Sequence, residues 1–173
     1  MGVSAGNYQI FSGYGSVQGL MFARPEWFGA IGDGVSENSS AISKTFSSVS
    51  SYGVVDFIGH AYAFNGVVTV TTSNITVRFN GTTFKIGDTN TAGTISNGAA
   101  GKIGFLFKGA DHLTITGSVR CIGQGTPGLT SLAGMVFDQC HYAHVTADMY
   151  FENMAAGRFV YWCDYGLFGD VVS

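Results

Sequence analysis

The chain has 173 residues, of which 46% are hydrophobic, 14% aromatic and only 11% charged. This composition excludes a disordered chain, which is rich in charge and poor in aromatics, and the length fits one domain. The net charge of −3 provides no basic patch for nucleic acid. No apolar run approaches the roughly 18 residues of a membrane span, so membrane insertion is not expected either.

Residues 1–23 are rich in glycine, serine and aromatics and show no clear period. They predict an irregular N-terminal arm with at most one short strand. Tyr8, Ile10, Phe11 and Tyr14 form an apolar cluster that a partner or a neighbouring subunit would cover. No charged-then-apolar leader opens the chain, so no secretory signal is predicted.

The next segment predicts a tight turn followed by a helix. Glycines surround Asp33, and glycine tolerates the positive φ of such turns, in which Asp33 would accept backbone N–H groups. Ser36 is placed as the helix N-cap, with Glu37 in the first turn. Apolar residues then recur at helical spacing, which predicts a helix over about residues 37–50 that stops at Gly53.

From Val54 onward, short β-branched and aromatic segments separated by Gly, Asn, Asp and Ser predict strands. Aligning residues 105–117, 135–147 and 159–171 brings apolar or small residues into columns: Phe107/Phe137/Tyr161, Leu113/Ala143/Leu167 and Ile115/Val145/Gly169. A fourth copy starts near Val70, with Ile75 and Val77 in the last two columns. A variable period of about 22 to 30 residues predicts an all-β solenoid rather than a sandwich, since each repeat must stack on its neighbours.

The run from Pro25 to Ile42, PEWFGAIGDGVSENSSAI, strongly resembles the opening segment of the pectate-lyase-like family of right-handed parallel β-helices, which includes bacteriophage tailspikes and capsule depolymerases. The chain keeps Trp27 and Gly29 and the turn Gly32-Asp33-Gly34, and it replaces the usual acidic pair by Glu37-Asn38. The resemblance covers roughly residues 24–170. It implies an N-terminal arm over 1–23 and, over 24–173, a right-handed parallel β-helix of about five to six coils, whose N-terminal end a short helix caps.

The resemblance also implies a function. Members are homotrimers that attach to the virion tail by their N-terminus, assemble in the host cytoplasm, and bind or cleave a bacterial surface polysaccharide. A non-enzymatic structural protein that docks on other tail or baseplate proteins through the arm is the alternative. The opening phrase is specific for the fold and poor evidence for any one activity, so whether the chain is a glycoside hydrolase or a lyase stays open. No cofactor is expected.

Candidate catalytic residues are the acids of the later repeats, because glycoside hydrolysis needs two carboxylates about 5 to 10 Å apart and a lyase needs a base with a cation nearby. These acids are Asp138, Asp148, Glu152 and Asp164. The alternative is that they are solvated surface charges. Trp162, Tyr165 and Arg158 are candidate ligand-binding residues. Tyr142, Tyr150 and Tyr161 could also stack on sugar rings, line a subunit interface or belong to the core.

Two further patterns have structural interpretations. His141 and His144 have HxxH spacing, but a strand would place the two rings on opposite faces, so no metal site is expected. The cysteines Cys121, Cys140 and Cys163 are odd in number and lack a CxxC spacing. They are interpreted as buried free thiols rather than as a disulfide framework.

Overall fold

The computed structural model describes residues 6–13, 15–87, 92–96, 100–124, 132–154, 156–161, 163–164, 166–168 and 171–172. The chain is mostly β, with two largely parallel sheets and, in the described part, one α-helix. No helix among these residues is long and apolar enough to cross a membrane.

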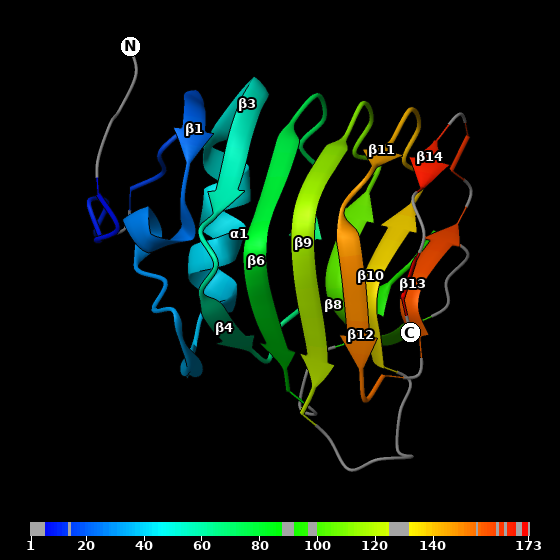
Figure 1. The fold of residues 1–173 in the computed structure, drawn as a ribbon. Helices are drawn as coiled ribbons and strands as arrows, with labels where there is room; N and C mark the ends of the chain where they lie inside the picture. The colour runs from blue at the N-terminus through cyan, green and yellow to red at the C-terminus, as the bar shows by residue number, and fades with distance from the viewer. Residues whose placement is uncertain are drawn as a thin grey trace.

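The larger sheet (sheet A) contains β1 (Leu20–Ala23), β2 (Asp33–Glu37), β3 (Val49–Phe57), β4 (Ala61–Phe64), β6 (Thr76–Ile86), β9 (Thr114–Gly123), β11 (His144–Val145), β12 (Asp148–Glu152), β14 (Leu167–Phe168) and β15 (Val171–Val172). The smaller sheet (sheet B) contains β5 (Val68–Val70), β7 (Ala92–Thr94), β8 (Ala100–Lys108), β10 (Leu132–Asp138) and β13 (Ala156–Tyr161). Only the pairing of β7 with β8 is antiparallel among the described pairs. Figure 1 shows the sheets as two layers, with strands following one another from β1 to β14.

From β5 onward, the chain passes alternately through sheet B and then sheet A. Along sheet A, Val55 pairs with Val77, Val77 with Ile115, and Ile115 with Val145. All four side chains are buried between the sheets. In sheet B, Val70, Phe107 and Phe137 form a matching column, and the rings of the two phenylalanines stack at 4.9 Å. The predicted columns are therefore confirmed over these repeats.

The third row of the sequence alignment is wrong by one residue. Tyr161 pairs with Asp138 rather than with Phe137, and Leu167 pairs with His144 rather than with Ala143. The spacing between the last two repeats is 23 residues at Cys140 and Cys163, whereas the alignment used one residue more. A one-residue slip moves a strand's side chains to the opposite face, so the register decides which residues are buried.

The helix is shorter than predicted and begins differently. α1 spans Ser39–Ser48, and its buried face, which includes Ile42 and Phe46, is the predicted one. Ser36 is not the N-cap: it lies in β2 and donates its hydroxyl to Asp33. The helix ends at Ser48 and strand β3 begins directly at Val49, which is the C-cap, so Gly53 does not serve as a C-cap. The pairing of β3 with β1 and β6 outweighs the local preference for a helix that ends at Gly53.

The Asp33 turn has the predicted chemistry. The Asp33 carboxylate accepts the N–H groups of Val35 and Ser36 at 2.8 Å and the Ser36 hydroxyl at 2.7 Å. These bonds, the one from the Ser36 N–H first, lower the pKa of the Asp33 carboxyl. The turn is therefore held best above the ordinary pKa of 3.8 and loses this support as the pH falls through the lowered value.

The other residues of the opening motif are structural as well. Trp27 is buried in the 3-10 helix η1 (Pro25–Phe28), which ends at Gly29 with φ 92°. Gly34 also has positive φ, at 71°. At Gly32, a Cβ would lie 2.5 Å from Cβ of His60, so a side chain there would push the turn off the sheet.

Part of the N-terminal arm packs on its own chain. The N–H groups of Ile10 and Phe11 both donate to the Trp27 carbonyl, and the ring of Phe11 lies 5.1 Å from that of Phe28. Ile10, Phe11 and Val17 cover the edge of the hydrophobic core beside η1. Of the cluster predicted to need a partner, Tyr8 is exposed and Tyr14 lies outside the described residues.

A bulge divides sheet A into two segments. The register of β6 against β9 shifts between Asn80 and Thr82, where Gly81 has φ 72°. The Asn80 side chain donates to Asp56 and to the Phe57 carbonyl across the same break. Opposite it, Gly117 has φ 92°, and a Cβ there would lie 1.8 Å from the Phe79 carbonyl oxygen.

Gly117 should therefore be much less replaceable than Gly81, although both have positive φ. A Cβ at Gly81 would meet nothing within 4 Å. Gly81→Ala should therefore lower the free energy of unfolding only by the cost of left-handed backbone at a non-glycine residue, about 1–2 kcal/mol. Gly117→Ala should cost about 1–3 kcal/mol more, because the backbone of β6 must move. Urea unfolding of the two variants checks this, and equal losses would refute the close approach.

Candidate functional site

The turns that join sheet B to sheet A lie along one edge of the molecule. In the six-residue turn Lys108–Leu113, Gly109 and His112 adopt positive φ, and in Asp138–Ala143 the residues Gln139 and Tyr142 do the same. Stacked turns bond through their backbones, with the His112 N–H donating to the His141 carbonyl at 2.9 Å. The same turn geometry therefore recurs from one repeat to the next.

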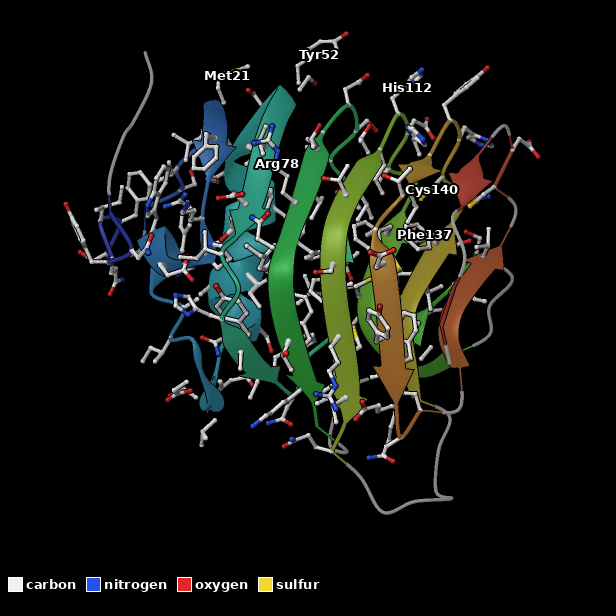
Figure 2. All side chains as sticks on the ribbon, in the orientation of Figure 1. Met21, Tyr52, Arg78, His112, Phe137 and Cys140 are labelled. Atoms are coloured by element: carbon white, nitrogen blue, oxygen red, sulfur yellow. The ribbon has the colours of Figure 1, made fainter. Side chains whose placement is uncertain are left out.

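A left-handed residue directly before a buried one recurs along this edge, in three turns and, at Tyr52, within strand β3. We call Tyr52, Asn74, His112 and Tyr142 the turn ladder, with φ of 67°, 56°, 52° and 57°. The rings of His112 and Tyr142 stack at 4.8 Å and 19°. Figure 2 shows Tyr52 and His112 extending outward from the same edge of the molecule.

The two tyrosines of the ladder are costly to the fold. Left-handed backbone at a non-glycine residue costs about 1–3 kcal/mol, and Asn is the easier choice among side chains. The Tyr142 ring stacks on His112, whereas the Tyr52 side chain is 79% exposed and gains little from burial. Neither backbone preference nor burial explains tyrosine at Tyr52, so its ring is a candidate for contact with a ligand.

A surface depression of about 500 Å³ lies between Tyr52 and His112. The other residues that line it are Asn74, Ile75, Thr76 and Thr114. The lining combines aromatic residues with an amide and hydroxyl groups, and among the residues that the structure describes it contains no Asp, Glu, Lys or Arg. Such a surface can hold the apolar face of a ring and donate to or accept from its hydroxyls.

The outer face of sheet A has a smaller hollow further along the strands. It measures about 190 Å³ and is lined by residues that include Thr83, Arg120 and Tyr150. Arg120 donates to Glu152, with nitrogen–oxygen distances of 2.6 and 2.8 Å. The side chains of Tyr150 and Tyr142 are both exposed, so neither belongs to the core.

The structure places the four candidate catalytic acids at separate locations. Asp148 and Glu152 are the two ends of strand β12, which puts their Cα atoms roughly 13 Å apart at strand spacing. Asp164 is exposed on the turn edge, 3.7 Å from the His141 ring. Asp138 belongs to sheet B and is fully buried. Asp164 occupies the position equivalent to His141 in the neighbouring repeat, not the position equivalent to Asp138.

Asp138 anchors the segment that follows β7 through hydrogen bonds with Ser96. Its carboxylate accepts the N–H and the hydroxyl of Ser96, both at 2.8 Å, while the Lys108 ammonium lies 4.0 Å away. Ile95 packs beside this point on Ile103, Leu106 and Val136, which face outward from sheet B. The second carboxylate oxygen of Asp138 is buried and has no partner in the described part. Asp138 is therefore covered by its own chain.

The candidate ligand-binding residues and the two histidines lie at the following places. Trp162 and Tyr165 lie outside the described residues, and of Arg158 only the backbone in β13 is described, opposite Met135. His141 lies in the turn before β11 and His144 is the first residue of that strand. The described residues contain no group of three or more His, Cys, Asp or Glu that could hold a metal ion.

Sequence reasoning missed the turn ladder. Tyr52 stands before Gly53 in a stretch that resembled a helix end, and only the stacked turns show that it shares a column with Asn74. The one available signal was the polar or aromatic residue directly before each buried column residue, at Asn74, His112 and Tyr142.

Comparisons with protein-family models, with curated proteins and with solved structures found no match to this chain.

Asp138 and Glu152 should differ sharply in their effect on stability. Asp138→Ala removes the buried acceptor of two part-buried donors of Ser96, which should cost about 1–3 kcal/mol. Glu152→Ala breaks an exposed ion pair and should cost at most about 1 kcal/mol. Thermal or urea unfolding measures both, and a loss at Asp138 no larger than that at Glu152 would contradict its anchoring role.

Proposed function

We propose that the chain is the N-terminal part of a right-handed parallel β-helix from a bacteriophage tailspike, and that it recognises a bacterial surface polysaccharide. The observation that carries recognition is the depression between Tyr52 and His112 on the turn edge. It combines aromatic residues with hydroxyl and amide groups on a repeated backbone, as a site for a chain of sugars requires.

The β-helix proposal is supported by the pairing of the strands. Successive repeats pair in parallel and in register in both sheets, with inner columns of apolar side chains. In sheet A, β3 and β4 pair with β6 on the two sides of the bulge, and β11 and β12 pair with β9 on the two sides of Gly117. Two such segments and one strand of sheet B would give a repeat the three sides of a β-helix coil. Helix α1 packs on β5 and η1 at the N-terminal end of this stack, the place of a capping helix. The opening motif that resembles tailspikes surrounds that same end.

The chemistry of the depression favours a neutral sugar. No charged carboxylate, ammonium or guanidinium group of the described residues lines it, whereas an anionic uronate or sialate ring calls for a cationic partner. Tyr52, Asn74 and His112 come from successive repeats, so they are spaced along the stack by the strand separation of roughly 4.8 Å. A linear glycan lying along the turn edge would thus meet one ladder residue after another.

The arrangement of the acids favours binding over cleavage in this part of the chain. Asp138 is buried, and Asp148 and Glu152 lie further apart than the about 5 to 10 Å that glycoside hydrolysis uses. Glu152 is also engaged by Arg120. Cleavage of a glycan would therefore depend on residues other than these acids.

The alternative is a structural tail protein that docks on the virion through its arm. Tyr8 is 63% exposed on the arm and Val35 is 80% exposed on the first repeat, so apolar groups at this end are open to a partner. Met21 and Ile31 are exposed at the same end. This surface also suits the subunit contacts of a trimer.

Glycan recognition is tested by binding to an array of purified capsular and O-antigen polysaccharides. Tyr52→Asn and His112→Asn keep a residue that tolerates left-handed backbone and remove the ring. Each should weaken binding at least about tenfold, equivalent to ~1.4 kcal/mol. Tyr8→Ala, an exposed tyrosine on the arm, is the control and should bind normally. Binding that both Asn variants retain would remove the turn edge from the proposal.

Trimer formation is tested by light scattering on the purified chain. The tailspike proposal expects a mass three times that of the 18.2 kDa chain. Val35→Asp together with Ile31→Asp should shift the mass toward monomer, since two charges would replace exposed apolar groups. A wild-type monomer at high concentration would mean that these residues do not suffice for assembly.

A further inference from the structure

Two thiols occupy equivalent turn positions in neighbouring repeats. Asp138 pairs with Tyr161, and two residues further along each chain segment stand Cys140 and Cys163. The Cys140 N–H donates to the sulfur of Cys163 at 3.3 Å. In the preceding repeat this position is the buried Ala110. The Cys163 side chain is therefore directed at the repeat that contains Cys140.

The two thiols differ in their surroundings. Cys140 is fully buried and its sulfur donates to the Phe107 carbonyl at 3.2 Å, whereas Cys163 is only partly buried and donates to Phe137 at 3.5 Å. The hydrogen bond with Cys163, together with burial, raises the pKa of the Cys140 thiol. Figure 2 shows Cys140 and Phe137 near each other in the later repeats. Oxidants in solution can thus reach the pair through Cys163.

The third thiol provides an internal comparison. Cys121 lies in β9, in register with Phe84 and Phe151, and is completely buried. Burial raises the pKa of its thiol. Both of its paired neighbours are phenylalanines, so the fold offers this sulfur an apolar environment. Its role agrees with that predicted for all three cysteines.

We propose that Cys140 and Cys163 form a disulfide that joins two successive repeats when the protein meets a small-molecule disulfide such as oxidised glutathione. Neighbouring parallel strands are roughly 4.8 Å apart, within the Cα separation of about 4.4–6.8 Å that a disulfide spans. To bond with Cys163, the sulfur of Cys140 would give up its hydrogen bond to the Phe107 carbonyl and rotate about the Cα–Cβ bond.

The exchange proceeds in two balanced steps. The Cys163 thiolate attacks one sulfur of oxidised glutathione, forming a mixed disulfide and releasing one glutathione thiolate. Cys140 then gives up its proton to solvent and attacks the Cys163 sulfur, which releases the second glutathione. Two protein thiols are oxidised by two electrons in total, and one glutathione disulfide is reduced to two thiols.

The cross-link would hold together the repeats at the C-terminal side of the described stack. It closes a loop over a sequence separation of 23 residues and so restricts the unfolded chain. The turn between β10 and β11, including Tyr142 of the turn ladder, lies inside this loop. The oxidised chain should therefore unfold at a midpoint several degrees higher than the reduced chain.

The test treats the intact chain with oxidised glutathione and follows it by mass spectrometry and thiol labelling. We expect the loss of two hydrogen atoms, a Cys140–Cys163 peptide after digestion, and one thiol, that of Cys121, labelled only after unfolding. Cys121→Ser should give the same cross-link. Cys140→Ser should stop at a glutathione adduct on Cys163, which shows that Cys163 is the site of first attack.

Three results would overturn the proposal. They are a stable glutathione adduct on Cys163 of the wild-type chain, a disulfide between two chains, and three thiols that remain reduced. The wild-type measurement decides the matter even if a serine variant fails to fold.

Discussion

The structure depends on parallel strands stacking in register. A single repeat cannot bury its inner face alone, because Val77 on β6 lies in register with Val55 on β3 and with Ile115 on β9. The aromatic contacts follow the same rule, since Phe84 lies 4.8 Å from Phe105 and 5.2 Å from Phe57, all on different strands. Stability is thus a property of neighbouring repeats together.

This constraint fixes the turns as well as the core. Once β8 and β10 are in register, the turns after them must have equal length, and their left-handed residues must coincide. Differences in length between repeats are absorbed elsewhere, as in the residues that follow β7, where Ile95 packs on Ile103, Leu106 and Val136 of sheet B and Ser96 donates to Asp138. Function can therefore be carried by turns and outer segments without disturbing the inner columns.

The features that could be predicted from the sequence are those set by local residue patterns. The buried positions from Val77 to Val145 follow from apolar periodicity, and the Asp33 turn follows from its glycines. Other features depend on contacts between distant segments. The burial of Asp138 comes from Ser96, which is 42 residues earlier, and the early end of α1 comes from the pairing of β3 with β1 and β6. The one-residue error at Tyr161 arose because small and aromatic residues alternate there without a clear apolar column.

The turn ladder could not be predicted because positive φ at tyrosine or histidine contradicts local preference. A stacked fold makes it possible, since each turn is held by the backbone bonds of the repeat beside it rather than by its own residues. Stacking therefore frees the side chain at this position from any role in forming the turn. An aromatic ring can then be placed at a regular interval along an edge, which is the property that a surface for a repeating polymer needs.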